Sequence, residues 1–172
     1  MVTPVAVLIG PPGAGKTTVG RRLAALLDVS FDDTDAIIER REARAIADIF
    51  VDDGEPYFRE VERSVVLDAI DAHGGVLALG GGAALDPLVQ NALSNHAVVF
   101  LDVGIADAAK RVGFDQSRPL LSVNPRASWV ALMNARRPVY ERLARHRVDT
   151  AGREVDDIAD EIVRLLAGGS ES

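Results

Sequence analysis

A glycine-rich segment near the N-terminus has the residue types that hold a polyphosphate. Residues 5–17 read VAVLIGPPGAGKT, an apolar run followed by the pattern G-x-x-x-x-G-K-T. Its glycines let the backbone wrap closely with the N–H groups pointing inward, at the positive end of the helix that should follow. Lys16 would add a mobile positive charge for β- and γ-phosphates, and the Thr17 hydroxyl suits Mg²⁺. A plain turn is the alternative, but the apolar run before and the helical pattern VGRRLAALL after are the context that phosphate binding requires.

The acidic segment DDTD at residues 32–35 is a second candidate for chemistry. Asp33 would lie close enough to the phosphate loop to hold Mg²⁺ through water, and Asp35 could accept the proton of an attacking hydroxyl. Capping of the following helix is the alternative use of these side chains. The third expected strand ends in three glycines rather than in an aspartate that could serve magnesium. Another carboxylate must then hold the ion, and Asp33 is the nearest candidate.

Gly80–Gly82 and Arg59 are candidates for contact with a small ligand. Three glycines carry no side chains, so a hydroxyl or carboxylate could approach their backbone without meeting a Cβ; a plain turn is the alternative. Arg59 has Glu55 and Glu62 one helical turn away on either side, so a surface row of ion pairs is the alternative for it.

Three further arginines could neutralise a phosphate or a carboxylate. Arg118 lies in the polar stretch GFDQSRPLL, which resembles a mobile lid over phosphates, or it is a solvated loop charge. Arg136 and Arg137 lie in an expected helix that Pro138 interrupts. The residues alone leave a functional role and an ordinary helix surface equally open for this pair.

Apolar runs and helical patterns alternate along the chain. Strands are expected near 5–9, 30–33, 76–79, 97–102 and 147–150, and helices near 16–28, 35–42, 45–70, 86–93, 105–112, 126–144 and 155–167. Such alternation predicts a parallel sheet wrapped by helices. Because ligands bind beyond the carboxyl ends of such strands, the loops that begin at Gly10, Asp33, Gly80 and Val103 should share one rim.

Composition sets limits on the kind of protein. The 172 residues, 48% of them apolar, suit a single domain with a full core. A net charge of −7 argues against a nucleic-acid partner. No apolar run has a membrane-spanning length and no signal peptide is evident, so we expect a cytoplasmic protein. The chain has no cysteine, and its three histidines show no spacing typical of metal ligands.

Six segments occur in an order that is specific as a set: GPPGAGKT, DTD, IADIFxxDGExxFRxxE, GGG, RPLL and RxPxY. Over about residues 5–150 this set resembles the shikimate kinase family. The resemblance implies an α/β fold, a three-layer αβα architecture around a five-stranded parallel sheet in the order 2-3-1-4-5, like P-loop nucleoside-monophosphate kinases. It implies one domain over 1–172, with a substrate-binding region at about 33–62 and a lid at about 112–124. The implied activity is ATP:shikimate 3-phosphotransfer in chorismate and aromatic amino-acid biosynthesis, with Mg²⁺ and with shikimate as the small-molecule partner of a monomer.

Roles follow residue by residue from this resemblance. Asp35 would bind a ring hydroxyl of shikimate and act as the base, while Arg59 and Arg136 would clamp the carboxylate. The catalytic set implied is Asp35, Lys16 and Arg118, and the metal set is Thr17 and Asp33. The nucleotide set is Gly13, Ala14, Gly15, Lys16, Thr17, Thr18, Arg111, Arg118 and Arg153, and the substrate set is Asp35, Arg59, Gly80, Gly81, Gly82 and Arg136. Arg111 would stack on adenine, and Arg153 falls in the stretch AGREV that closes the adenine pocket, here without the proline often found there.

Two other functions use part of the same pattern. A kinase of another small metabolite, such as gluconate, would share the phosphate loop but not the DTD, GGG and RxPxY segments. A nucleotide-dependent switch would not need two arginines and Asp35 at one small pocket, and it would usually carry an N-K-x-D-type guanine signature, which this chain lacks.

Overall fold

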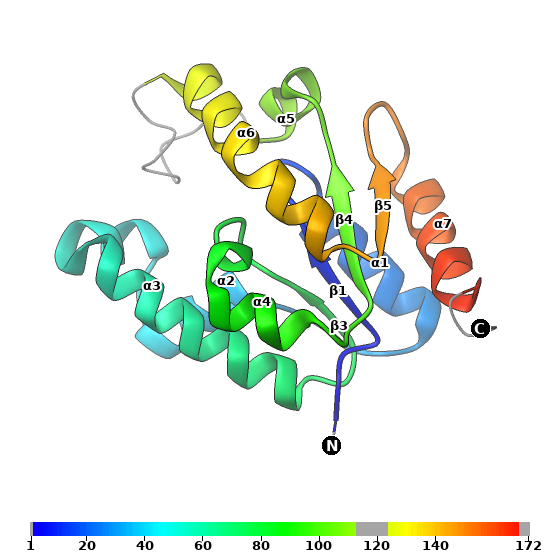
Figure 1. Ribbon diagram of the computed structural model, residues 1–172, viewed down its shortest axis with the longest axis horizontal. Helices are drawn as coiled ribbons and strands as arrows, with labels where there is room; N and C mark the ends of the chain where they lie inside the picture. The colour runs from blue at the N-terminus through cyan, green and yellow to red at the C-terminus, as the bar shows by residue number, and fades with distance from the viewer. Residues whose placement is uncertain (1, 113–123, 169–172) are drawn as a thin grey trace.

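Five parallel strands form one sheet at the centre of the protein. A computed structural model describes residues 2–112 and 124–168 of the chain. The strands are β1 (Ala6–Ile9), β2 (Phe31–Asp33), β3 (Val76–Ala78), β4 (Val98–Asp102) and β5 (His146–Asp149). Their order is β2-β3-β1-β4-β5, and every neighbouring pair runs parallel (Figure 1). The expected α/β class, strand number and strand order are therefore confirmed.

Helices cover both faces of the sheet. They are α1 (Lys16–Leu27), α2 (Thr34–Glu42), α3 (Ile46–Ala72), α4 (Pro87–Leu93), α5 (Ile105–Val112), α6 (Pro125–Leu143) and α7 (Val155–Gly168), with a short 3-10 helix η1 at Ala83–Leu85. Helices α1 and α7 pack against each other on one side, and α3, α4 and α6 lie on the other (Figure 1). This arrangement explains why β1 and β4 are buried along their whole length and read as continuous apolar runs.

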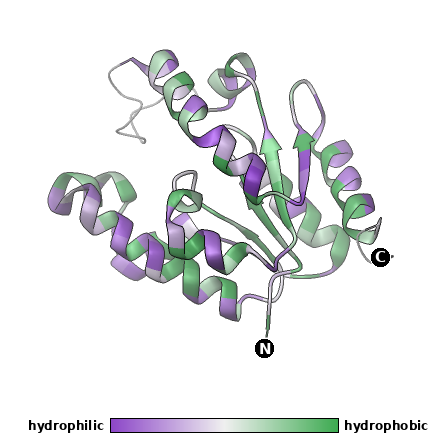
Figure 2. Cartoon of the chain, in the orientation of Figure 1, coloured by the Kyte–Doolittle hydropathy of each residue, from purple (hydrophilic) through white to green (hydrophobic). Residues whose placement is uncertain are grey.

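A second, smaller core lies away from the sheet between α2 and α3. It consists of Ile38, Ile49, Phe58 and Val65, all at most 4% exposed. Burying an aliphatic or aromatic side chain of this size stabilises a fold by about 1.5–3 kcal/mol. This core therefore packs α2 against the part of α3 that carries Arg59. Figure 2 shows that the strands β1 and β4 are hydrophobic, whereas hydrophilic residues are spread along α3.

Helix α3 bends where the sequence predicts an uninterrupted helix over 45–70. Gly54 adopts φ 84° and ψ 169°, a conformation outside the helical region that glycine tolerates best. Pro56 follows two residues later and has no N–H to donate to the preceding turn. The residues before this bend and those after it therefore point in different directions.

The part of the chain that the structure describes contains no helix with the length and apolar character needed to cross a membrane. The expected lid at 112–124 lies almost entirely outside the described residues, and Arg118 lies outside them with it.

Candidate active site

The phosphate loop connects β1 to α1, as its sequence predicts. Gly15 caps α1 with φ 88°, which places the free N–H groups of the first helical turn at the loop. Lys16 donates hydrogen bonds from Nζ to the carbonyl oxygens of Gly10 (2.7 Å) and Pro11 (3.1 Å). From the other side, Trp129 of α6 donates from Nε1 to the Pro12 carbonyl at 2.9 Å. The lysine ammonium thus lies against the loop whose N–H groups would hold phosphate.

Asp33 joins the loop to the end of β2. The Thr17 hydroxyl donates to Asp33 Oδ2 at 2.7 Å, and Asp33 Oδ1 accepts from the backbone N–H of Asp35 at 2.8 Å. Asp33 is therefore the N-cap of α2, so capping and contact with Thr17 use different oxygens of one carboxylate. The two hard oxygen groups of Thr17 and Asp33 are of the type that Mg²⁺ prefers. Among the described residues, no cluster of three or more His, Cys, Asp or Glu side chains could hold a metal by protein ligands alone.

A cavity of about 520 Å³ opens between α3, α6 and the segment after β3. Arg59 and Arg136, which come from different helices, both line it. The remaining lining residues are Glu55, Glu62, Arg63, Gly82, Ala83, Leu85, Asp86, Val89, Leu132 and Ala135. The structure therefore brings two guanidinium groups to one small space.

Gly80–Gly82 pass directly beside the charged side chains. A Cβ added at Gly80 would lie 2.5 Å from Asp35 Oδ1, and one added at Gly81 would lie 3.0 Å from Arg136 Nη1. A Cβ at Gly82 would overlap the Arg59 guanidinium. The absence of side chains at these three positions thus lets the predicted carboxylate and both arginines lie close against one backbone segment.

A buried carboxylate lies among these groups. Glu62 is 4% exposed, and its Oε1 accepts a hydrogen bond from Arg59 Nη1 at 2.7 Å. Burial raises the pKa of Glu62, against the lowering effect of the Arg59 charge, and the nearby Asp35 raises it further. In the sequence, Glu62 is noted only as a neighbour of Arg59, although a glutamate three residues after an arginine on a helix predicts this contact.

Arg136 is buried more deeply than a surface cation would be. It is 5% exposed, and its Nε has no hydrogen-bond partner among the described residues. One turn later, the Tyr140 hydroxyl donates to the Gly81 carbonyl at 2.6 Å. Burial is the main cause that raises the pKa of Tyr140. Tyr140, which ends the segment RxPxY but is not among the expected site residues, thus joins α6 to the glycine segment.

The nucleotide-side residues lie around the phosphate loop. Arg111, at the end of α5, donates from Nη1 to the carbonyls of Gly13 (3.1 Å) and Ala14 (3.3 Å) and also contacts Thr150. Arg153 pairs with Glu161 at 2.6 Å in the turn region between β5 and α7. Thr18 is exposed on α1, next to Thr17. Arg111 therefore bridges the phosphate loop and the turn after β5, whereas Arg153 is held by an acidic partner of α7.

Comparisons with known proteins identify the family of this chain. The family model described as Shikimate kinase matches residues 12–167. A shikimate kinase of Thermobifida fusca is 52% identical over 168 residues, which cover 98% of both chains. One from Frankia casuarinae is also 52% identical and covers 96% of this chain and 75% of its own length.

Solved structures give the same result. Shikimate kinase from Acinetobacter baumannii, solved in complex with shikimate, is 35% identical and superimposes with a TM-score of 0.94 over 100% of this chain and 97% of that chain. Shikimate kinase from Aquifex aeolicus is 30% identical, with a TM-score of 0.79 over 96% of this chain and 97% of that one. A gluconokinase from Sinorhizobium meliloti, with 19% identity and a TM-score of 0.60, shares the fold alone. The phosphate loop, the glycine segment and the paired arginines thus occur in a chain that belongs to the shikimate kinase family.

Proposed function

We propose that the cavity beside Gly80–Gly82 binds shikimate and that ATP bound at the phosphate loop donates its γ-phosphate to the 3-hydroxyl of shikimate. As a member of the shikimate kinase family, the protein is a phosphotransferase of aromatic amino-acid biosynthesis. The observation that carries the assignment of the cavity is that Arg59 and Arg136 line it together. Asp35 lies at Gly80, two residues before the cavity residue Gly82. The structure of the Acinetobacter baumannii relative with shikimate supports the choice of ligand.

The cavity suits a small polyol carboxylate. Two guanidinium groups offer forked N–H donors to a carboxylate, which is the geometry that arginine provides and lysine does not. The Nε of Arg136 is buried without a partner among the described residues, so a bound carboxylate oxygen would satisfy a donor that the protein leaves unused. Arg59 is held by Glu62 and reaches the backbone at Gly82.

Asp35 is the proposed base. Its carboxylate lies against Gly80, at the carboxyl ends of β2 and β3 and next to Asp33, whose other partner is Thr17 of the phosphate loop. In the transfer, a lone pair of the 3-hydroxyl oxygen forms a bond to the γ-phosphorus, the bond from that phosphorus to the β-phosphate oxygen breaks, and the hydroxyl proton passes to Asp35. ADP is the leaving group.

Charge neutralisation is proposed for Lys16 and Arg118, the second of which lies outside the described residues. Thr17 would hold Mg²⁺ directly and Asp33 through water, and the bound ion would neutralise the charge of the β- and γ-phosphates. The loop residues Gly13, Ala14, Gly15 and Thr18 are proposed to surround the phosphates, with Arg111 and Arg153 on the adenine side.

The partners and compartment are proposed as well. Phosphate loop, base and carboxylate clamp all come from one chain, which supports a monomer. The net charge of −7 supports the absence of a nucleic-acid partner. We place the protein in the cytoplasm, where its ATP is available, without a membrane partner.

A substrate panel tests this function. Purified protein with MgATP is offered shikimate, quinate, gluconate and nucleoside monophosphates, and ADP release is measured with each. ADP release that depends on shikimate, with phosphate on its 3-oxygen, is the expected result. Turnover with gluconate or a nucleotide but not with shikimate would overturn the proposal.

A further inference from the structure

Asp102, the last residue of β4, is a buried carboxylate that the proposed chemistry does not use. The residue is 5% exposed and lies at the rim where the loops of the site begin. Its Oδ2 accepts from Arg137 Nη1 at 2.7 Å and its Oδ1 from Arg137 Nη2 at 2.9 Å. This forked pair is the strongest arrangement of arginine on a carboxylate. It ties α6 directly to the end of the central sheet.

A second arginine and a backbone N–H also donate hydrogen bonds to the Asp102 carboxylate. Arg147 of β5 donates from Nε to Asp102 Oδ2 at 2.9 Å and from Nη2 to the same oxygen. The backbone N–H of Val103 donates to Oδ1 at 2.9 Å. Because a buried charge is tolerated only when paired and hydrogen-bonded, these contacts explain how Asp102 remains ionised inside the protein.

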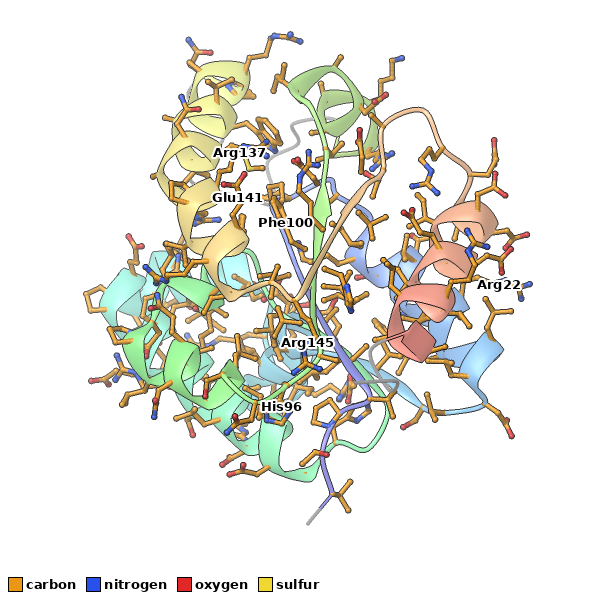
Figure 3. The ribbon with its side chains drawn as sticks, turned by 45° about the vertical axis from the view of Figure 1, so that its right-hand side comes forward. Arg22, His96, Phe100, Arg137, Glu141 and Arg145 are labelled. Atoms are coloured by element: carbon orange, nitrogen blue, oxygen red, sulfur yellow. The ribbon has the colours of Figure 1, made fainter. Side chains whose placement is uncertain are left out.

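Arg137 is adjacent to Arg136 on α6. Successive helical residues point about 100° apart, so one residue can face β4 while its neighbour faces the cavity. Pro138 follows immediately and cannot donate a hydrogen bond to the Asn134 carbonyl, which leaves the helix without one internal bond at this point. The fork from Arg137 to Asp102 therefore fixes α6 where its own backbone holds it less firmly. Figure 3 shows Arg137 and Glu141 on α6 beside Phe100 of β4. The Cζ atom of Arg137 lies over the Phe100 ring, 5.9 Å from the ring centroid.

The backbone carbonyl of Asp102 serves the other half of the site. It accepts from the Thr150 N–H at 2.9 Å and from the Thr150 hydroxyl at 2.8 Å. Thr150 in turn accepts from Arg111, which contacts the phosphate loop. A side-chain substitution at residue 102 removes the carboxylate contacts but keeps the carbonyl. The two halves of the site can therefore be perturbed separately.

We propose that Asp102 is a positioning residue for shikimate binding, which acts through Arg137 to fix the part of α6 that presents Arg136 to the cavity. This inference rests on the proposed function, because it concerns the affinity for shikimate. In the proposed reaction, Asp102 does not touch a reacting atom. Its effect should therefore appear in the KM for shikimate, with little effect on kcat or on the KM for ATP.

Two variants and one matched control test the proposal. Asp102→Asn removes the charge that holds both guanidinium groups, and Arg137→Lys keeps the positive charge but loses the fork. Each should raise the KM for shikimate about 3- to 30-fold, the range expected for a residue that acts through a neighbour. Glu141→Gln removes the exposed carboxylate 3.8 Å from the same Arg137 and leaves the fork intact, so its kinetics should match the wild type. Arg137→Lys decides the question if Asp102→Asn does not fold.

A second measurement needs no turnover. Calorimetric titration with shikimate in the absence of ATP gives the shikimate Kd directly. The shikimate Kd should rise in parallel with the KM in both variants. An unchanged KM and Kd for shikimate in Arg137→Lys would overturn the inference, and so would equal increases in the KM for shikimate and for ATP. A wild type that does not phosphorylate shikimate would overturn the proposed function and this inference with it, whereas unchanged variants of an active wild type would overturn this inference alone.

Discussion

Glu62 Oε1 accepts a 2.7 Å hydrogen bond from Arg59 Nη1 inside the same helix, and Glu62 is buried while Arg59 lines the cavity. A Cβ added at Gly80 would lie 3.2 Å from Glu62 Oε2 and 2.5 Å from Asp35 Oδ1, so two carboxylates meet at one glycine. Glu62 therefore orients an arginine of the clamp and places a second negative charge near the proposed base. This arrangement has a measurable effect on stability.

The pKa of Glu62 is raised above its ordinary value of 4.5, chiefly by burial. The folded state then holds the proton more firmly than the unfolded state, so stability falls as the pH rises from about 4.5 through the folded pKa. Glu62→Gln cannot titrate, and its stability relative to the wild type should increase across this window. Denaturant unfolding of both proteins at several pH values measures the difference. A difference that does not change with pH would contradict the raised pKa.

Asp102 gives the opposite pH dependence and serves as the comparison. Burial acts to raise its pKa, but the hydrogen bonds and charges of Arg137 and Arg147 prevail and the pKa lies below the ordinary 3.8. Its contribution to stability is present above about 3.8 and is lost as the pH falls through the folded pKa. Asp102→Asn should therefore cost about 2 kcal/mol near neutral pH, the size of a hydrogen bond to a charged group, and this cost should shrink in acid. The same unfolding experiments measure it, and a cost that grows in acid would refute the assignment.

Local sequence predicts much of this site because most of its parts are local. The phosphate loop, the DTD segment and the glycine triplet each follow a strand, and parallel strands bring their carboxyl ends to one rim. The capping and metal interpretations of Asp33 are not exclusive, since its two oxygens have different partners. Which oxygen of Asp33 meets which partner depends on side-chain geometry, and the spacing of residues in the sequence does not reveal it.

Other features depend on contacts between distant segments. Asp102 meets Arg137 and Arg147 only after β4, α6 and β5 have assembled, and no motif relates the three. Because this assembly brings Arg137 to Asp102 of β4, Arg137 is an ion-pair partner of the sheet rather than an ordinary surface cation. The bend at Gly54 is missed because the apolar spacing of 45–70 continues across it, while one glycine with positive φ redirects the chain.

Substitutions of Asp35 and of Lys16 should have different effects on turnover and on ATP affinity. Asp35→Asn keeps the size of the side chain but cannot accept a proton, so turnover should fall at least about 100-fold while ATP affinity is kept. Lys16→Ala should lose ATP affinity as well as turnover, because it removes a charge at the phosphate loop. Single-turnover rates and ATP titrations separate the two effects. If Asp35→Asn retained a nearly full rate, Asp35 would only order the start of α2.

Gly82 offers a test of the clamp that does not remove an arginine. Its φ of −93° and ψ of −10° suit alanine, so Gly82→Ala should not strain the backbone. The new methyl group would overlap the Arg59 guanidinium and displace it. We expect the KM for shikimate to rise about 10- to 100-fold, as misplaced binding groups cause. Gly104→Ala is the control, because an added Cβ there meets nothing within 4 Å; equal effects of both variants would contradict a specific role for Gly82.

Arg136 should set the preference for a charged ligand. Hydrogen bonds to charged groups contribute about 1.5–3 kcal/mol, so Arg136→Ala should weaken shikimate binding about 10- to 150-fold. The methyl ester of shikimate lacks the negative charge, so its weaker binding should change little in the same variant. Arg142→Ala provides the control, since Arg142 lies on the same helix but is exposed and donates to Gln90. Calorimetric titration of both ligands against the three proteins measures this. Equal losses for acid and ester would mean that Arg136 supports the shape of the cavity, because a carboxylate clamp must distinguish the two ligands by charge.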